Sequence, residues 1–488
     1  MEDNTKEPVV RDQATEKSLE AQQPNHGDSP PFGRKIASSR KTMSIITIAS
    51  CAIANLSDGY QNSLASNMNV IFKHLIPKAY TSEVQTRISN SLLVGSVIGI
   101  LILGYCSDRW SRKGGMFFTS GLVFIGSLMA TLVFQVKGGP HKMMWYLTIA
   151  RGIAGVGAGG EYPTSAAAAL EGSNEHFDRK RGPIQVMMST FTATFAGPLC
   201  TFIYLMTIMA TGNNLSVAYH AMYGFATCLP VIILILRIRM GDALIFKKSN
   251  FKHERVPYWL VIKKYWLRLL GTSSAFFLYD FINFPNSIMS GTIVNKVVPS
   301  HNIKTVAIWQ FILNVLPVPG VIVGAYLTNK IGRRWTGIIG FLGYVVFGFI
   351  VGGAYKPLTE RSIPAFIVLY GLMQCMGHLG PGATIGLMSV ESYPTAVRGM
   401  GYGISAAFGK AGAAVGTQVF LPIEDSAGQA ATFFVAGGIG IVGALIYYFI
   451  PEGKNMDLEQ EDAKFVEYLR SNGWQGKLST VEYVEEGS

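Results

Sequence analysis

The chain has 488 residues, of which 49% are hydrophobic and 15% charged, and its formal net charge is +11. Soluble domains usually have about 25% charged residues, so this composition argues against a soluble protein. Apolar stretches of about 20 residues recur along the sequence, and each can cross the hydrocarbon layer of a membrane as a helix. The positive charge is therefore expected to orient the chain in a membrane, and not to bind nucleic acid.

Twelve membrane-spanning helices are expected in chain order, which predicts an all-α membrane protein. Their predicted ranges are 43–72, 88–107, 115–136, 143–171, 184–210, 219–239, 265–294, 305–327, 335–353, 363–390, 400–421 and 430–450. Lysine and arginine are enriched in the loops that face the cytoplasm when both termini lie inside. This bias predicts cytoplasmic N- and C-termini.

The predicted spans divide into two lobes of six helices, at residues 42–240 and 265–450. A basic segment at residues 241–264 joins them and is expected to meet anionic lipid at the cytoplasmic face of the membrane. Residues 1–41 are polar and contain several prolines, which predicts a disordered cytoplasmic tail. Residues 451–488 are acidic and are expected to form a second cytoplasmic tail.

A short motif that lies between two spans occurs once in each lobe. One copy begins at Gly104 and the other at Gly324, and each continues with small and cationic residues. The interval between these glycines also separates Glu171 from Glu391. Two copies of a helical unit with a cation-rich turn are typical of a two-lobed secondary transporter. The residues predicted to control its gating are Gly104, Asp108, Arg109, Arg112, Arg151, Glu171, Gly324, Arg333, Arg334, Glu391 and Arg398.

The fourth predicted span contains a glycine-rich stretch that begins after Arg151 and ends before Glu161. No strand precedes it, so it is not a dinucleotide-binding loop. Glycines at this spacing permit close packing against a neighbouring helix. Lipid does not tolerate the two flanking charges, so both are expected to face the lobe interior or a wet cavity.

These motifs resemble those of the major facilitator superfamily. The matching residues are the doubled loop motif, Arg151-x-x-x-Gly155-x-Gly157 and Glu391-Ser392-Tyr393-Pro394-Thr395-Ala396-Val397-Arg398-Gly399. The stretch Gly159-Gly160-Glu161-Tyr162-Pro163-x-Ser165 resembles the phosphate:proton symporter branch. Within that branch, roughly residues 42–480 are similar to fungal glycerophosphodiester permeases, which import glycerophosphoinositol and glycerophosphocholine. The residues that carry this similarity are Ser57-Asp58-Gly59-Tyr60, Tyr279-Asp280-Phe281, Phe284-Pro285-Asn286, Gly380-Pro381-Gly382, Gly403-Ile404-Ser405-Ala406-Ala407, Gly409-Lys410 and Ser471-Asn472-Gly473-Trp474.

The resemblance implies a proton-coupled importer of the plasma membrane, whose two lobes rock around a central site. Its expected partners are a small phosphodiester, protons and membrane lipid.

Ionisable residues within the predicted spans are the candidates for that site. They are Asp58, Arg151, Glu161, Asp280 and Lys410. Each costs from about 2.5 kcal/mol upward in the membrane, so each needs a partner or a function. Mutual pairing, Arg151 with Glu161 or Asp280 with Lys410, would make them structural. The functional alternative is that three acids and a cation serve a central cavity.

Lys410 is the predicted anchor for the single negative charge of a phosphodiester. The resemblance places the substrate-and-proton acid at Asp280. A carboxylate repels a phosphate unless it is protonated, so proton and substrate are expected to bind together. Asp58 and Glu161 are predicted to relay the proton, and the Tyr162 hydroxyl to donate to a phosphate oxygen.

The chain departs from phosphate transporters of the branch at three positions. Those proteins have a Trp four residues before the seventh-span acid and a Tyr four residues after it, where this chain has Phe276 and Phe284. Their tenth-span Gly-Pro-Asn is replaced by Gly380-Pro381-Gly382. The loss of two donors and one bulky side chain favours a larger phosphodiester over inorganic phosphate. The two phenylalanines are either packing residues or faces for a choline head group.

Other functions fit the same pattern. The scaffold would also suit an inorganic phosphate symporter or an exporter of another organic anion. A non-transporting nutrient sensor would be expected to carry a longer signalling tail. No nucleophile–base pair or metal-ligand cluster stands out in the sequence, so neither an enzyme nor a cofactor or metal site is expected.

Overall fold

The computed structural model describes residues 31–109, 112–174, 181–239, 257–298, 302–394, 396–454 and 458–474. Every regular element in these ranges is a helix, as predicted. By its contacts the chain divides into a unit of residues 1–44 and a unit of residues 45–488. The packing, the cavity and the site all belong to the second unit.

Helices make up almost all of the described residues. In chain order they are α2 (Pro31–Leu75), α3 (Ser82–Arg109), α4 (Arg112–Thr131), η1 (Val133–Gln135), α5 (Gly139–Asn174), α6 (Arg181–Val186), η3 (Met187–Phe191), α7 (Thr192–Ala210), α8 (Leu215–Arg239), α10 (Tyr258–Ile288), α11 (Ser290–Val297), α12 (Ile303–Val315), α13 (Pro317–Lys330), α14 (Arg333–Gly353), α15 (Tyr355–Arg361), α16 (Ile363–Leu379), α17 (Pro381–Glu391), α18 (Arg398–Ala427), α19 (Ala431–Phe449) and α20 (Leu458–Ser471). The predicted spans 305–327 and 363–390 are each divided into two helices, because Pro317 and Pro381 begin the second helix.

Eight helical stretches of the described residues are long and apolar enough to cross a membrane. The other four predicted spans correspond to α2, α5, α10 and α18, which are long but contain more polar, charged and glycine residues. These four helices carry all five of the ionisable residues singled out in the sequence. The helices with the weakest hydrophobic signal are therefore the ones that supply the candidate site.

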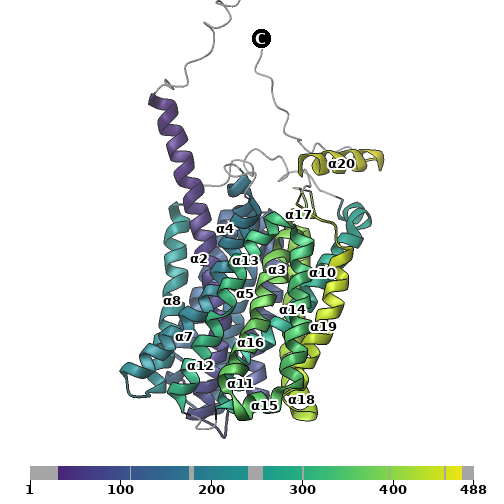
Figure 1. Ribbon diagram of the computed structural model, residues 1–488. Coiled ribbons are helices and arrows are strands. Elements are labelled where there is room, and N and C mark those ends of the chain that lie inside the picture. Colours follow the sequence, from purple (N-terminus) through teal and green to yellow (C-terminus); the bar gives the residue numbers. More distant parts are fainter. Residues whose placement is uncertain are drawn as a thin grey trace, which may run out of the picture. The chain divides into compact units, whose positions relative to one another are not determined.

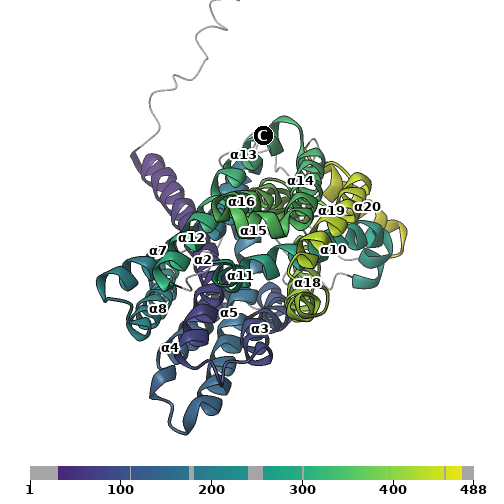
Figure 2. The same ribbon diagram turned by 60° about the horizontal axis from the view of Figure 1, so that its bottom comes forward.

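Helices of each half of the chain pack mainly on one another. In the first half α3 contacts α5, and α4 contacts α5 and α8; in the second, α10 contacts α18, and α14 contacts α16 and α19. Between the halves, α3 lies against α18 and α7 against α12 (Figures 1 and 2). The lobe boundaries stay predictions, since residues 1–30, 240–256 and 475–488 lie outside the described residues.

Glycines allow α3 and α5 to approach each other closely. A Cβ atom on Gly155 would clash with the backbone oxygen of Leu92, and one on Gly159 would clash with that of Ser96. A Cβ atom on Gly99 of α3 would likewise clash with the backbone oxygen of Val156. The glycine-rich stretch is thus a packing surface, as its spacing predicted.

Gly155→Ala is expected to lower the free energy of unfolding by about 1–3 kcal/mol, because the added methyl group forces two backbones apart. Gly121→Ala on α4 is the matched control, since a Cβ there meets nothing within 4 Å. Alanine is favoured over glycine in a helix, so the control should be neutral or stabilising. Apparent melting temperatures of the purified variants in detergent compare the two. Equal stability would contradict the close contact.

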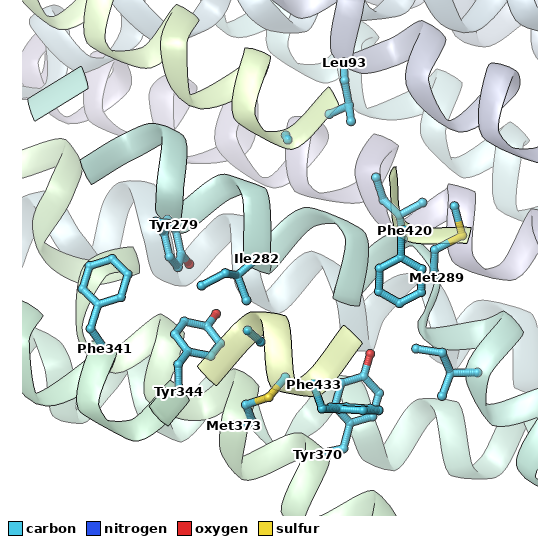
Figure 3. Close-up of a cluster of buried hydrophobic side chains, with 14 of the residues drawn as sticks. Leu93, Tyr279, Ile282, Met289, Phe341, Tyr344, Tyr370, Met373, Phe420 and Phe433 are labelled. Atoms are coloured by element: carbon cyan, nitrogen blue, oxygen red, sulfur yellow. The ribbon is translucent and has the colours of Figure 1, made fainter. Parts of the chain in front are cut away.

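An aromatic core fixes α10 in the second half of the chain. Tyr279 and Ile282 of α10 face α14 (Figure 3). Tyr370 of α16 packs edge-on against Phe433 of α19 with ring centroids 5.2 Å apart, and its hydroxyl donates to the backbone oxygen of Asn286 at 2.7 Å. These contacts hold α10 so that its opposite side turns Asp280 toward the other half of the molecule.

Candidate functional site

A cavity of about 200 Å³ lies between the two halves of the chain and is lined by both. Its walls come from α2, α5, α6, η3 and α7 of the first half and from α10, α12, α13, α16, α17 and α18 of the second. The sequence-predicted residues that line it are Asp58, Tyr162, Phe276, Asp280, Phe284, Gly382 and Lys410. All predicted substrate-binding residues therefore lie around one space.

Lys410 of α18 is only 3% exposed, yet it forms no ion pair with any described residue. Its Nζ donates to the Tyr162 hydroxyl at 3.0 Å. It also lies 4.0 Å from the centre of the Phe284 ring and 4.6 Å from that of Tyr162. Ring faces attract a cation but do not neutralise it, so this ammonium can accept an anion.

Two carboxylates face the cavity from opposite halves. Asp58 of α2 accepts a hydrogen bond from the Tyr162 hydroxyl at 2.7 Å, which connects it through Tyr162 to Lys410. Asp280 of α10 is 5% exposed and has no hydrogen bond or ion pair with a described residue. The alternative in which Asp280 pairs directly with Lys410 is therefore wrong.

Glu161 has a partner that the sequence analysis missed. Arg237 of α8, which is fully buried, donates to both Glu161 oxygens at 2.7 and 2.5 Å. Thr119 and Ser120 also donate to Glu161, at 2.7 and 3.1 Å. The only signal in the sequence was one arginine near the end of an apolar run.

Arg151 does not pair with Glu161, so that alternative is wrong too. Its guanidinium donates to the backbone oxygen of Ile88 and to the Tyr223 hydroxyl, both at 3.2 Å. With 1% of its surface exposed, it lies in the interior of the first half, as expected. A space of about 10 Å³ separates Glu161 from Asp58, which is close to the room that one water molecule needs.

The extra room predicted at Gly382 is absent. The hydroxyl of Tyr279 lies 2.5 Å from the position that a Cβ on Gly382 would take. Thr190 of η3 donates to the Gly382 backbone oxygen at 2.9 Å, which joins the two halves there. Phe276 packs edge-on against Tyr402, with ring centroids 6.2 Å apart. The side chain lost at Gly382 is thus replaced by a tyrosine from another helix.

Amide side chains are the main cavity residues that the sequence analysis missed. They are Asn55, Asn62, Gln185, Asn283, Asn314 and Gln374. Helical spacing carried a usable signal for two of them, because Asn62 follows Asp58 by one turn and Asn283 follows Asp280 by one turn.

Hydrogen bonds join the two halves at the end of the cavity that is near the loop of residues 76–81. The hydroxyls of Ser66 and Ser290 lie 2.8 Å apart, and Gln310 donates to Ser66 at 2.7 Å. Nearby, Gln85 of α3 donates to Thr292 of α11 at 2.9 Å. These contacts close that end.

The second copy of the loop motif forms a buried ion pair at the opposite end. Arg333 donates to both oxygens of Glu391 at 3.1 and 2.9 Å. Glu452 accepts from the backbone nitrogens of Arg333 and Arg334, and so caps α14. Arg398 donates to the Tyr393 backbone oxygen at 3.3 Å. Gly324 lies where α13 meets the backbone of α16 at Leu379.

The side chains of the first copy, which begins at Gly104, lie outside those that the structure describes. The side chains that fall outside the described residues are those of Gly104, Asp108, Arg109, Arg112 and Glu171. Their gating roles, like those of the second copy, stay predictions.

Comparison with known proteins agrees with this architecture. A family model described as "Sugar (and other) transporter" matches residues 43–465. The chain is 56% identical over 450 residues to the MFS-type transporter lnaF of Aspergillus flavus, which covers 91% of both chains. It is 40% identical over 468 residues to Glycerophosphoinositol permease 1 of Candida albicans, which covers 94% of this chain and 88% of that protein. The resemblance to fungal glycerophosphodiester permeases is thereby confirmed.

A solved structure supports the fold. The xylose transporter XylE from E. coli, in a partially occluded inward open conformation, matches with a TM-score of 0.69 at 17% identity. The match covers 86% of this chain and 100% of that one. The predicted fold, twelve transmembrane helices in two six-helix lobes, is confirmed, and the relatives are transporters and not enzymes. The chain belongs to the Sugar (and other) transporter family of the major facilitator superfamily.

Proposed function

We propose that this protein imports glycerophosphodiesters together with protons across the plasma membrane, by alternating access of its two lobes. Relatives that are 40% identical are named as glycerophosphoinositol transporters in Candida albicans and Saccharomyces cerevisiae. A relative that is 29% identical is named Glycerophosphocholine permease GIT4. Both termini are placed in the cytoplasm in this proposal, in agreement with the positive loops.

The observation that carries the proposal is the buried charge set of the cavity. Lys410 is a cation without an ion-pair partner among the described residues, and Asp58 and Asp280 face it from opposite halves. A phosphodiester has one negative charge, which the ammonium attracts and the two carboxylates repel. Protonation of one carboxylate removes much of that repulsion, so substrate and proton stabilise each other in the site.

Glu161 is not among the residues that line the cavity, but it lies near Asp58, which does line it. Its pairing with Arg237 keeps it out of direct contact with substrate. The small space between Glu161 and Asp58 has room for one water molecule, through which a proton can pass from one carboxylate to the other. Asp58 and Asp280 are then the acids that meet the cavity directly.

Gating in this proposal uses both ends of the cavity. The Ser66–Ser290–Gln310 contacts close the outer end, and they must separate for the substrate to enter from outside. At the cytoplasmic end the Arg333–Glu391 pair holds the motif loop to α17 while the lobes rock.

A second candidate function uses the same site for a different substrate. The relative that is 56% identical is named only as an MFS-type transporter, without a substrate. Inorganic phosphate symport or export of another organic anion would use the same Lys410 cation. Inhibition of glycerophosphodiester uptake by free phosphate distinguishes the phosphate symporter from the proposed function. Efflux of an organic anion from preloaded cells distinguishes the exporter.

The proposal is tested by uptake of labelled glycerophosphoinositol and glycerophosphocholine into cells that lack their own transporters. Expression of this chain is expected to produce accumulation that is greater at the lower of two external pH values. Absence of accumulation would contradict the substrate class, and pH-independent accumulation would contradict the coupling.

Asp280→Asn is expected to separate exchange from accumulation, because the amide imitates a protonated acid that can no longer release its proton. Accumulation should fall by about tenfold or more, while exchange of external for internal label continues. The measurement is net uptake and counterflow in the same cells. Accumulation at the wild-type level would remove Asp280 from the coupling site.

A further inference from the structure

Phe284, one of the two phenylalanines considered as faces for a choline head group, already faces a cation. Lys410 Nζ lies over the Phe284 ring at 4.0 Å and the Tyr162 ring at 4.6 Å. A quaternary ammonium on the same faces would meet this like charge at short range in a poorly solvated space. Phe276 is covered at its edge by Tyr402. The aromatic part of the cavity is therefore suited to the phosphate and not to a second cation.

One turn further toward the closed end, the cavity wall consists of amide and hydroxyl groups. Asn62 of α2 and Asn283 of α10 contribute from opposite halves, with Asn314 of α12 and Gln374 of α16 beside them. Asn283 is 9% exposed and its Oδ1 is buried without a hydrogen-bond partner among the described residues. Asn62 Oδ1 is in the same situation.

Where such amide groups line a cavity, a ligand can satisfy them. Each buried polar atom that lacks a partner costs about 1–3 kcal/mol, which is recovered when a ligand supplies the hydrogen bond. An amide offers both donors and acceptors, and a hydroxyl group can match either. Choline has no hydroxyl and no N–H to offer once it is esterified, whereas an inositol ring has several hydroxyls.

A glycine and two polar side chains border this part of the cavity wall. A Cβ on Gly197 of α7 would lie 3.1 Å from Asn314 Oδ1 and 3.6 Å from Ser63 Oγ, so the glycine backbone borders this part of the cavity. The contact between Ser66 and Ser290 closes the cavity one turn beyond Ser63. A head group that is bound here would be enclosed on that side.

We propose that Asn62, Asn283, Asn314 and Gln374 form a polyol subsite that selects glycerophosphodiesters with a polyhydroxyl head group over those with a quaternary ammonium. The proposal rests on the proposed function, because it requires the phosphodiester to bind at Lys410. The glyceryl group that all these substrates share has only two free hydroxyls, fewer than the four amides of this wall. An inositol ring supplies enough hydroxyls for all of them.

The test measures uptake of tritiated glycerophosphoinositol into transporter-null cells that express the full chain. Unlabelled glycerophosphoinositol and glycerophosphocholine compete with the label. In the wild type, half-inhibition should require about tenfold more glycerophosphocholine, because amides built to bind hydroxyls are left unpaired by choline. Asn283→Leu should raise the half-inhibiting concentration of glycerophosphoinositol about tenfold and leave that of glycerophosphocholine within about twofold.

Two further variants keep the test informative. Gly197→Ala narrows the same wall by one methyl group and should act in the same direction as Asn283→Leu. Asn286→Leu, on α10 but outside the cavity, should leave the ratio of the two competitors unchanged, because the Asn286 side chain donates to the backbone oxygen of Ile282 and does not line the cavity. A fluorescent tag reports the amount of each variant at the cell surface.

Three results would overturn the proposal. Equal competition by the two compounds in the wild type would contradict selection of a polyol. An equal loss of affinity for both in Asn283→Leu would assign the amides to the shared glyceryl group. Uptake of neither compound would overturn the proposed function itself, and this inference with it.

Discussion

Lys410→Met is expected to abolish transport while the protein still reaches the membrane. Methionine keeps most of the volume and the contacts with the Phe284 and Tyr162 rings, but it leaves Asp58 and Asp280 facing a cavity without its cation. Loss of a buried charge that a ligand charge pairs with costs about 2–5 kcal/mol, so uptake should fall on the order of 100-fold or more.

Lys304→Met is the matched control for this experiment. Lys304 has the same charge but an exposed side chain on α12, away from the cavity, so its replacement should leave uptake unchanged. Initial rates are compared at equal surface expression. Uptake by Lys410→Met near the wild-type level would remove this lysine from the substrate site.

Arg237→Met is expected to produce the largest loss of stability. Arg237 is fully buried and binds Glu161 with two hydrogen bonds, and it also donates to Ser120 and to the Met116 backbone oxygen. Its removal leaves the carboxylate buried without its cation, which costs about 3–5 kcal/mol. The yield and apparent melting temperature of the purified protein should both fall.

Glu161→Gln in the same chain should restore much of that loss, because a neutral amide no longer needs the guanidinium. The double variant is therefore expected to be more stable than Arg237→Met alone, and the difference measures the uncompensated charge. A melting temperature of Arg237→Met equal to that of the wild type would show that the pair contributes nothing to stability.

The sequence predicted the helices well, because hydrophobic length is a local property of the chain. Each of the twelve predicted ranges overlaps one helix, or two or three consecutive helices, of the structure. The four helices with the weakest hydrophobic signal, α2, α5, α10 and α18, were still recognised, because charged residues within their predicted spans occur singly and far apart.

Charge partners could not be predicted in the same way, because they come from helices that are distant in sequence. One erroneous pair was avoidable. Arg151 and Glu161 both lie on α5, and ten residues of helix separate them by about 15 Å along its axis, which is too far for direct contact. The Glu161–Arg237 pair depends on how α5 and α8 pack across α4, which the sequence does not state.

Tertiary packing also determines which parts of the cavity are empty and which are filled by side chains of other helices. The short side chain at Gly382 suggested a larger site, but the Tyr279 hydroxyl from α10 fills the position. The same packing brings together amides from α2, α10, α12 and α16, none of which formed a motif in the sequence. Residues that bind a flexible organic group need only share a wall of the cavity, so their spacing along the chain carries little signal.

The most direct test of proton-coupled glycerophosphodiester transport uses the purified full-length protein in sealed lipid vesicles. Tritiated glycerophosphoinositol is added outside, with the vesicle lumen one pH unit more alkaline than the medium. The label should accumulate above its external concentration, and a protonophore that collapses the gradient should abolish this accumulation. Equal label uptake with and without the pH gradient, or none beyond that of empty vesicles, would contradict the account.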